Sequence, residues 1–184
     1  MVKAPKPFGT PSVRTRRTYF DCKFGQLHVR TAFPTTGGFD EQVTLICLHP
    51  DDGSSRAFSR ILPELADVRS VYAPDLPGYG ESDSSPGRSV VDAASAIADL
   101  ANDLRLRQID LLGVRSGAEV AMELAVARPE LVRRLVLAGV PSQRAAAVKQ
   151  PHWVIDVGGF GEDPFDTASK ALVARINAYL LGRS

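Results

Sequence analysis

The sequence lacks the residues and runs that mark several classes of protein. It has two cysteines, Cys22 and Cys47, too few for a disulfide framework, so we expect free, buried thiols in a reducing compartment. No apolar run approaches the roughly 18 residues that a membrane-spanning helix needs. The N-terminal residues are basic and proline-containing, without the apolar core of a secretory signal. We therefore expect a cytoplasmic protein with no membrane partner.

Charge of either sign is also not in excess. The chain carries 22 Lys and Arg against 21 Asp and Glu, a net charge of +1. Its one basic cluster, Arg14, Arg16 and Arg17, is short and typical of a solvated surface, so no nucleic-acid partner is expected. A length of 184 residues with 44% hydrophobic content suits one compact domain. We expect a flexible tail over residues 1–12 and a single domain over residues 13–184.

Strand-like and helix-like segments alternate along most of the chain. The expected strands are 17–22, 26–33, 43–48, 70–74, 109–114, 135–140 and 153–157, and the expected helices are 54–66, 89–106, 117–127, 142–149 and 165–181. Pro63 is the point at which the helix over 54–66 is expected to bend or split. This alternation predicts an α/β protein, a three-layer α/β/α sandwich with a mostly parallel sheet.

The most informative segment is residues 111–118, which read Leu-Leu-Gly-Val-Arg-Ser-Gly-Ala. A strand that turns sharply into a helix needs glycines two residues before and two after its apex. Gly113 and Gly117 provide this frame, and the residue midway between them is Arg115. A guanidinium stays protonated and has no lone pair with which to attack a carbonyl.

Four segments together resemble the α/β-hydrolase superfamily, particularly its esterase, dehalogenase and epoxide-hydrolase-like members. They are 48–50 (Leu-His-Pro), 75–82 (Asp-Leu-Pro-Gly-Tyr-Gly-Glu-Ser), 111–118 and 133–139 (Arg-Arg-Leu-Val-Leu-Ala-Gly). The resemblance runs from about residue 17 to 141. It implies an α/β-hydrolase fold in which Arg115 stands in the place of the nucleophile.

The resemblance also implies that the catalytic triad is degenerate. In this superfamily a histidine follows the last strand, but the loop at 157–165 reads Val-Gly-Gly-Phe-Gly-Glu-Asp-Pro-Phe, with Glu162 at that place. A second register would liken residues 161–164 to the turn that carries the acid, and it leaves no histidine downstream.

The remaining histidines are poor candidates for a general base. His28 lies in a strand alternation and is expected at the surface or in packing. His49 belongs to the oxyanion-side loop, where it is expected to support the backbone. His152 lies at the N-terminal end of its strand, whereas catalytic groups gather at the carboxyl ends.

The oxyanion-side loop departs from the pattern as well. Pro50 has no N–H to donate, and Asp51 and Asp52 place carboxylates where an anionic intermediate would need stabilisation. Asp75 is expected to keep a structural role in the turn that follows it.

The fold itself is expected in a reduced form. Only about a dozen residues separate Val140 from Trp153, and a βαβ crossover needs nearly all of them. We therefore expect no lid and one strand fewer.

Three functions stay open on the sequence alone. The first is a protein of hydrolase lineage without ordinary serine-hydrolase activity, in which Arg115 and Glu162 form an ion pair. The second is an atypical hydrolase of ester-type substrates that uses Ser116. The third is a module that binds a small anion, such as a carboxylate, through Arg115 and the helix start at 116–117. No metal or cofactor is expected. The expected partner is a small molecule or none, with a homodimer as one way to cover exposed apolar surface and a short sheet edge.

Overall fold

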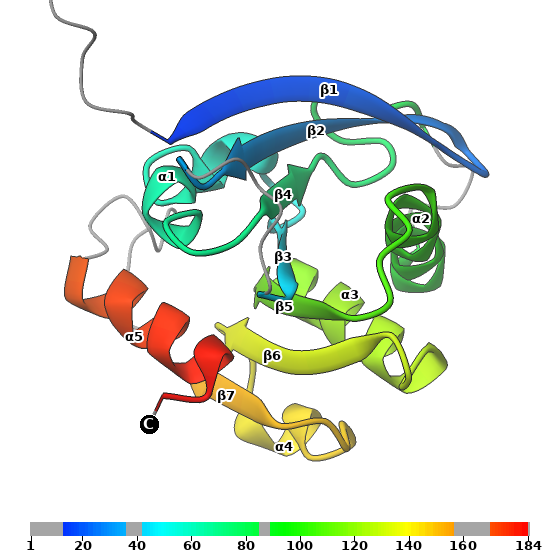
Figure 1. The fold of residues 1–184 in the computed structure, drawn as a ribbon. Helices are drawn as coiled ribbons and strands as arrows, with labels where there is room; N and C mark the ends of the chain where they lie inside the picture. The colour runs from blue at the N-terminus through cyan, green and yellow to red at the C-terminus, as the bar shows by residue number, and fades with distance from the viewer. Residues whose placement is uncertain (1–12, 36–41, 85–88, 157–169, 184) are drawn as a thin grey trace, which may run out of the picture.

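The computed structural model describes residues 13–35, 42–84, 89–156 and 170–183. In these segments seven strands form one mixed sheet (Figure 1), in the order β1-β2-β4-β3-β5-β6-β7. The strands are β1 Arg14–Cys22, β2 Gly25–Phe33, β3 Thr44–Leu48, β4 Val71–Pro74, β5 Ile109–Val114, β6 Val132–Ala138 and β7 His152–Ile155. The pairs β1/β2 and β2/β4 are antiparallel, and the pairs from β4 to β7 are parallel. The predicted mostly parallel sheet is confirmed.

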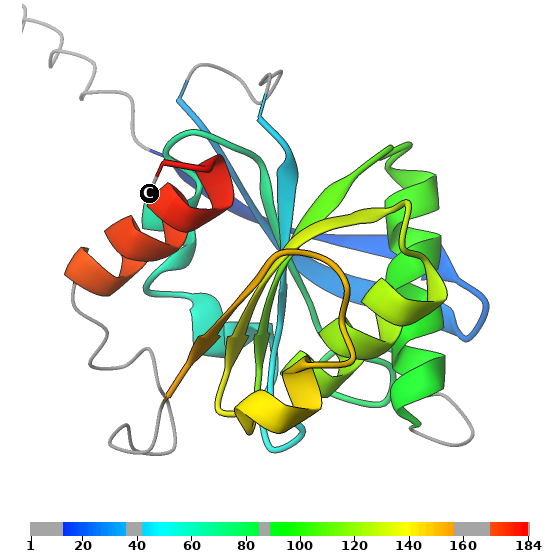
Figure 2. The ribbon, with the colours of Figure 1, turned by 90° about the horizontal axis from the view of Figure 1, so that it is seen from below.

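Helices cover both faces of this sheet, which confirms the three layers (Figure 2). One face carries α2 Val90–Asp103, α3 Ser116–Ala127 and the short α4 Ser142–Ala145; the other carries the 3-10 helix η1 Ser55–Phe58, α1 Leu62–Leu65 and α5 Lys170–Leu181. Each face has its own apolar core, because successive side chains of a strand point to opposite sides of the sheet.

The expected helix over 54–66 is instead two short helices. Pro63 lies in the first turn of α1, where its missing N–H leaves no helical hydrogen bond unmade. The chain therefore restarts at Leu62 and does not continue from η1. The expected start of α2 is confirmed, since Ser89 accepts a hydrogen bond from the Asp92 N–H at 3.0 Å.

A buried ionic cluster lies at the beginning of β5. Asp110 on β5 is fully buried, and its Oδ2 accepts hydrogen bonds from Arg69 Nη1 at 2.8 Å and from Arg133 Nη2 at 2.6 Å. The Arg69 side chain is itself 0% exposed, whereas that of Arg133 is 29% exposed. Two guanidinium groups thus share one carboxylate inside the protein.

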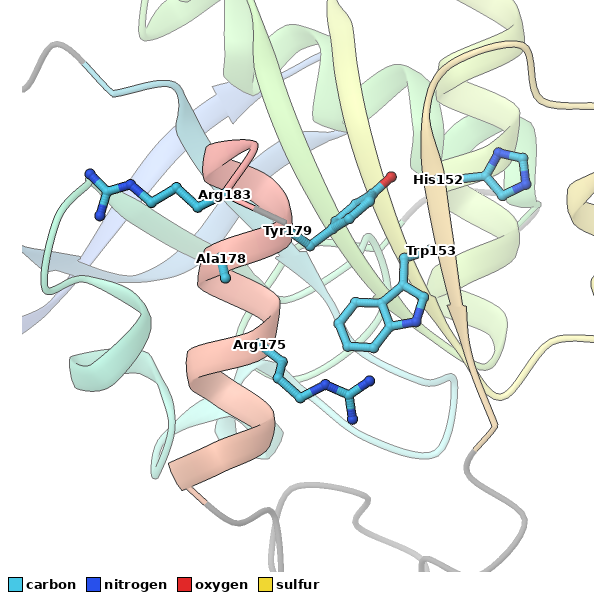
Figure 3. A pocket seen from close by; sticks show the side chains of 6 residues that line it. All are labelled: His152, Trp153, Arg175, Ala178, Tyr179 and Arg183. Carbon is cyan, nitrogen blue, oxygen red and sulfur yellow. The ribbon is translucent and has the colours of Figure 1, made fainter.

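The link from β6 to β7, residues 139–151, is described throughout, and its regular structure is α4 alone. The expected helix over 142–149 ends at Ala145. Strand β7 is the last in the described sheet, with no described strand beyond its outer edge, and α5 lies beside it (Figure 3). The expected homodimer therefore stays a prediction.

The two cysteines are free, Cys47 buried and Cys22 half-buried. None of the helices in the described segments is long and apolar enough to cross a membrane. The tail over residues 1–12 lies outside the described residues.

Candidate functional site

The strand–helix turn predicted at residues 113–117 joins β5 to α3 at the carboxyl end of the sheet. Arg115 lies at its apex, with φ 50° and ψ −117°. Residues other than glycine rarely adopt this backbone conformation. It costs about 1–3 kcal/mol and persists only where surrounding contacts impose it. Here the Arg115 N–H donates to the Ala138 carbonyl at 2.7 Å, and the Arg115 carbonyl accepts from the Ala118 N–H at 2.9 Å.

The two glycines of the turn are required by close backbone contacts. A Cβ added at Gly113 would lie 2.5 Å from the Cα of Ala118. A Cβ added at Gly117 would lie 2.2 Å from the carbonyl oxygen of Leu48 at the end of β3. The frame that places Arg115 midway between these glycines is therefore the frame that the backbone adopts.

Ser116 begins α3 and is bonded to the loop after β3. Its Oγ accepts from the Asp51 N–H at 2.6 Å and donates to Asp51 Oδ1 at 2.7 Å. This double contact engages the backbone N–H that the oxyanion-side loop presents at Asp51. It also holds the serine hydroxyl against a carboxylate, without the imidazole that accepts the proton in a Ser-His-Asp arrangement.

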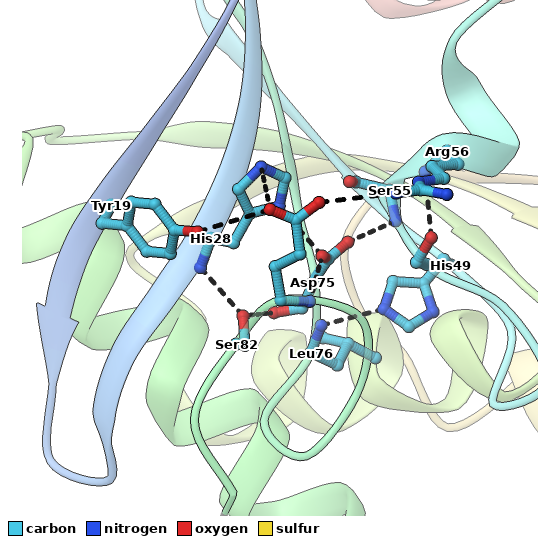
Figure 4. A network of polar contacts seen from close by, with 10 residues as sticks. Tyr19, His28, His49, Ser55, Arg56, Asp75, Leu76 and Ser82 are labelled. Carbon is cyan, nitrogen blue, oxygen red and sulfur yellow. Dashed lines mark hydrogen bonds and ion pairs between the residues drawn. The ribbon is translucent and has the colours of Figure 1, made fainter.

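His49 joins the loops after β3 and β4 (Figure 4). Its Nδ1 lies 2.7 Å from the Pro50 carbonyl oxygen and its Nε2 accepts from the Leu76 N–H at 2.8 Å, so the neutral ring donates at one nitrogen and accepts at the other. Burial lowers the pKa of His49, although the Pro50 carbonyl and nearby carboxylates act in the opposite direction. The ring supports backbone, as the sequence predicts.

His28 and Asp75 form a buried pair that the sequence did not indicate. The side chain of His28 is 1% exposed, and its Nδ1 lies 2.9 Å from Asp75 Oδ2. The same carboxylate accepts from the N–H of Ser55 at 2.6 Å and of Glu81 at 2.9 Å (Figure 4). Burial raises the pKa of Asp75, but the hydrogen bonds from Ser55, Glu81 and His28 outweigh it and hold the pKa below its ordinary value. Asp75 thus organises the turn after β4.

The other predicted residues are placed less fully. His152 begins β7, with its Nδ1 3.0 Å from the Gln150 carbonyl oxygen, at the N-terminal end of the strand. Glu162 lies outside the described residues, and so does its expected contact with Arg115. Across the described segments, no group of three His, Cys, Asp or Glu side chains lies close enough to hold a metal ion.

Comparison with known proteins gives the same fold and a family. Over 84 residues the chain is 44% identical to 2-hydroxymuconate semialdehyde hydrolase of Pseudomonas sp. (strain CF600), covering 43% of this chain and 29% of that protein. The solved structure of Cfl2 from Burkholderia cenocepacia has a TM-score of 0.60 and 31% identity, covering 70% of this chain and 45% of that one. The N-acyl homoserine lactonase AidH complexed with N-butanoyl homoserine has a TM-score of 0.60 and 26% identity, covering 68% and 45%.

The chain thus spans less than half the length of these relatives. Residues 43–179, from just before β3 to the last turn of α5, match the family described as alpha/beta hydrolase fold. On this match the chain belongs to the alpha/beta hydrolase fold family.

Proposed function

We propose that this chain is an alpha/beta-hydrolase-fold protein without ordinary serine-hydrolase activity. The observation that carries the proposal is Arg115 at the apex of the elbow, with φ 50°. Covalent catalysis needs an oxygen, sulfur or nitrogen lone pair at that point, and a guanidinium has none to give. Acyl transfer to the elbow residue is therefore closed to this chain.

The surroundings of Ser116 support the same proposal. The sequence has three histidines, and each has a contact elsewhere: His28 with Asp75, His49 with the backbone of two loops, and His152 with the Gln150 carbonyl. The hydroxyl of Ser116 instead faces the Asp51 carboxylate. A negative charge there opposes an oxyanion, whereas hydrolases place donors at this position.

The proposal extends to the lid and to the place of the base. The short described link between β6 and β7 supports a lidless fold. We expect Arg115, which is half-buried, and Glu162 to form an ion pair across the elbow. A double-mutant cycle with Arg115→Ala and Glu162→Ala tests the pair, and additive losses would reject it.

Ester hydrolysis and active-site labelling test the main proposal. Wild type, Ser116→Ala and Arg115→Ser are assayed with para-nitrophenyl acetate and butyrate, and each is exposed to a fluorophosphonate probe. We expect wild type and Ser116→Ala to match the uncatalysed rate and to stay unlabelled. Arg115→Ser is expected to remain inactive on the esters, because it gains a hydroxyl but no imidazole. Wild-type turnover that Ser116→Ala abolishes would establish the atypical hydrolase instead.

The anion-binding alternative rests on Arg115 at the N-terminus of α3, where helix N–H groups and a guanidinium favour negative charge. The Asp51 carboxylate, bonded to Ser116, lies beside the same helix start and opposes an incoming anion. Titration of acetate against wild type and Arg115→Ala separates the anion-binding alternative from the main proposal. Binding that is present in wild type and lost in the variant would favour the anion site.

A further inference from the structure

A pocket lies beside the last strand of the sheet, between β7 and α5. Its volume is about 370 Å³, within the roughly 300–1,000 Å³ of small-molecule sites. Six residues line it (Figure 3): His152, Trp153, Arg175, Ala178, Tyr179 and Arg183. Its strand residues begin β7, whereas Arg115 lies at the opposite, carboxyl end of the sheet. The pocket is therefore separate from the elbow.

Two aromatic side chains form the walls of the pocket. The ring centroids of Trp153 and Tyr179 lie 5.9 Å apart, and the ring planes are inclined by 54°. Neither residue is fully buried, so each offers part of a ring surface to solvent. Such surfaces suit a flat apolar ring, which gains both burial and a preferred aromatic geometry against them.

Positive charge lies over one of these two rings. Arg175 Cζ is 5.0 Å from the centroid of the Trp153 ring. A guanidinium held against an aromatic ring keeps N–H donors along its edge, in the fork that matches a carboxylate. None of the described lining residues is acidic. Arg183 adds a second cation among them, although its side chain points away from the rings in Figure 3.

The neighbouring arginines of β6 differ because their donors are engaged by the protein. Arg134 Nη1 donates to the Tyr179 carbonyl at 2.6 Å, and Arg133 donates to Asp110 and to the Leu180 carbonyl. The positive charge available to a ligand in this pocket is therefore that of Arg175 and Arg183.

The hydroxyl of Tyr179 provides a further unmet donor. It is buried, and no described residue forms a hydrogen bond with it. Buried polar groups are nearly always paired, so this one calls for a partner. Burial raises the pKa of Tyr179, against the opposing effect of Arg134, so the phenol keeps its proton at neutral pH.

We propose that this pocket binds an aromatic carboxylate, with the ring of the ligand against Trp153 and Tyr179 and its carboxylate on Arg175. Charge-assisted, bidentate pairing selects the carboxylate, and the aromatic walls select the ring. The site does not depend on the elbow or on the proposed loss of hydrolase activity.

Trp153 makes the proposal directly measurable, because it is the only tryptophan of the chain. Its indole Nε1–H gives one peak in a ¹H–¹⁵N NMR spectrum, so a moving peak reports this pocket alone. Benzoate and biphenyl-4-carboxylate are the probes, and benzamide and acetate are the controls that lack the charge or the ring. We expect saturable shifts with the two aromatic acids, and at least tenfold weaker responses to benzamide and acetate, since each lacks one of the two recognition elements.

Variants then test the assigned residues. Arg175→Gln is expected to weaken benzoate binding by at least about tenfold, because the variant loses the charge-assisted pairing with the carboxylate. Arg107→Gln removes an exposed charge outside the pocket and is expected to leave binding unchanged. Both positions are exposed, so neither variant is expected to unfold the protein. Equal responses to benzoate and benzamide, no response to either acid, or equal weakening in both variants would each overturn the proposal.

Discussion

The backbone at Arg115 makes a prediction that separates strain from side-chain contacts. A residue with a Cβ at φ 50° and ψ −117° loses about 1–3 kcal/mol, and glycine avoids this loss. Glycine also gains freedom in the unfolded chain, which offsets about 0.4–1 kcal/mol. We therefore expect Arg115→Gly to be more stable than Arg115→Ala by about 1 kcal/mol. Both variants remove the same guanidinium, so its contacts cancel in the comparison.

A matched pair of glycine and alanine variants at Val126 is expected to show the opposite order of stability. This residue is exposed within α3, at an ordinary helical position. There Val126→Gly is expected to be less stable than Val126→Ala by about 0.8–1 kcal/mol. The sign of the Gly–Ala difference should therefore reverse between two residues of the same segment.

Urea unfolding followed by far-UV circular dichroism measures all four variants. A difference of 1 kcal/mol moves the midpoint by about 0.5 M at a typical dependence of stability on urea. If Arg115→Ala proves at least as stable as Arg115→Gly, the apex is not strained in solution. The reasoning that places Arg115 at a sharp nucleophile-type turn would then be refuted.

Three further predictions follow from the fold. Asp110→Ala should lower the free energy of unfolding by about 3–5 kcal/mol, because it leaves the fully buried Arg69 without a counter-charge. Arg128→Ala, at an exposed ion pair, should lower it by less than about 1 kcal/mol. Similar losses in the two variants would contradict a stabilising role of the Asp110 carboxylate. Because the pKa of His49 lies below its ordinary 6.5 in the fold, its contribution to stability is complete above that pH and declines as the pH falls; His49→Gln should flatten the slope between neutral and acidic pH, and an unchanged slope would contradict this. A homodimer across the edge of β7 should appear by light scattering, and monomer alone at high concentration would rule it out.

The elbow was predictable from the sequence because two glycines at this spacing mark a sharp strand-to-helix turn. The close contact at Gly117 is with Leu48 on the adjacent strand, whereas the contact at Gly113 is local, with Ala118. The same holds for the cap at Ser89, where a hydroxyl and a nearby N–H are close in sequence. The mostly parallel sheet also followed from the alternation of strands and helices, since parallel strands need crossovers.

Contacts between distant segments were not predictable in this way. The alternation along β2 predicts only which face of the sheet His28 lies on. It does not predict the contact with Asp75, which directly follows β4. Asp110 interrupts an apolar strand without any sign of its two arginines. The split of the expected helix at 54–66 is different, because Pro63 in the first turn of α1 marks it in the sequence itself.

The contact between Asp51 and Ser116 has a consequence for any molecule that approaches the elbow. A free anion would compete there with a carboxylate that the chain itself holds in place, and whose effective concentration is on the order of millimolar or higher. Shortening that side chain, as in Asp51→Ala, would remove the bond from the serine hydroxyl to the carboxylate. The bond from the backbone N–H of residue 51 to Ser116 Oγ does not involve that side chain. The loop after β3 thus places a carboxylate of the chain itself against the Ser116 hydroxyl at the start of α3.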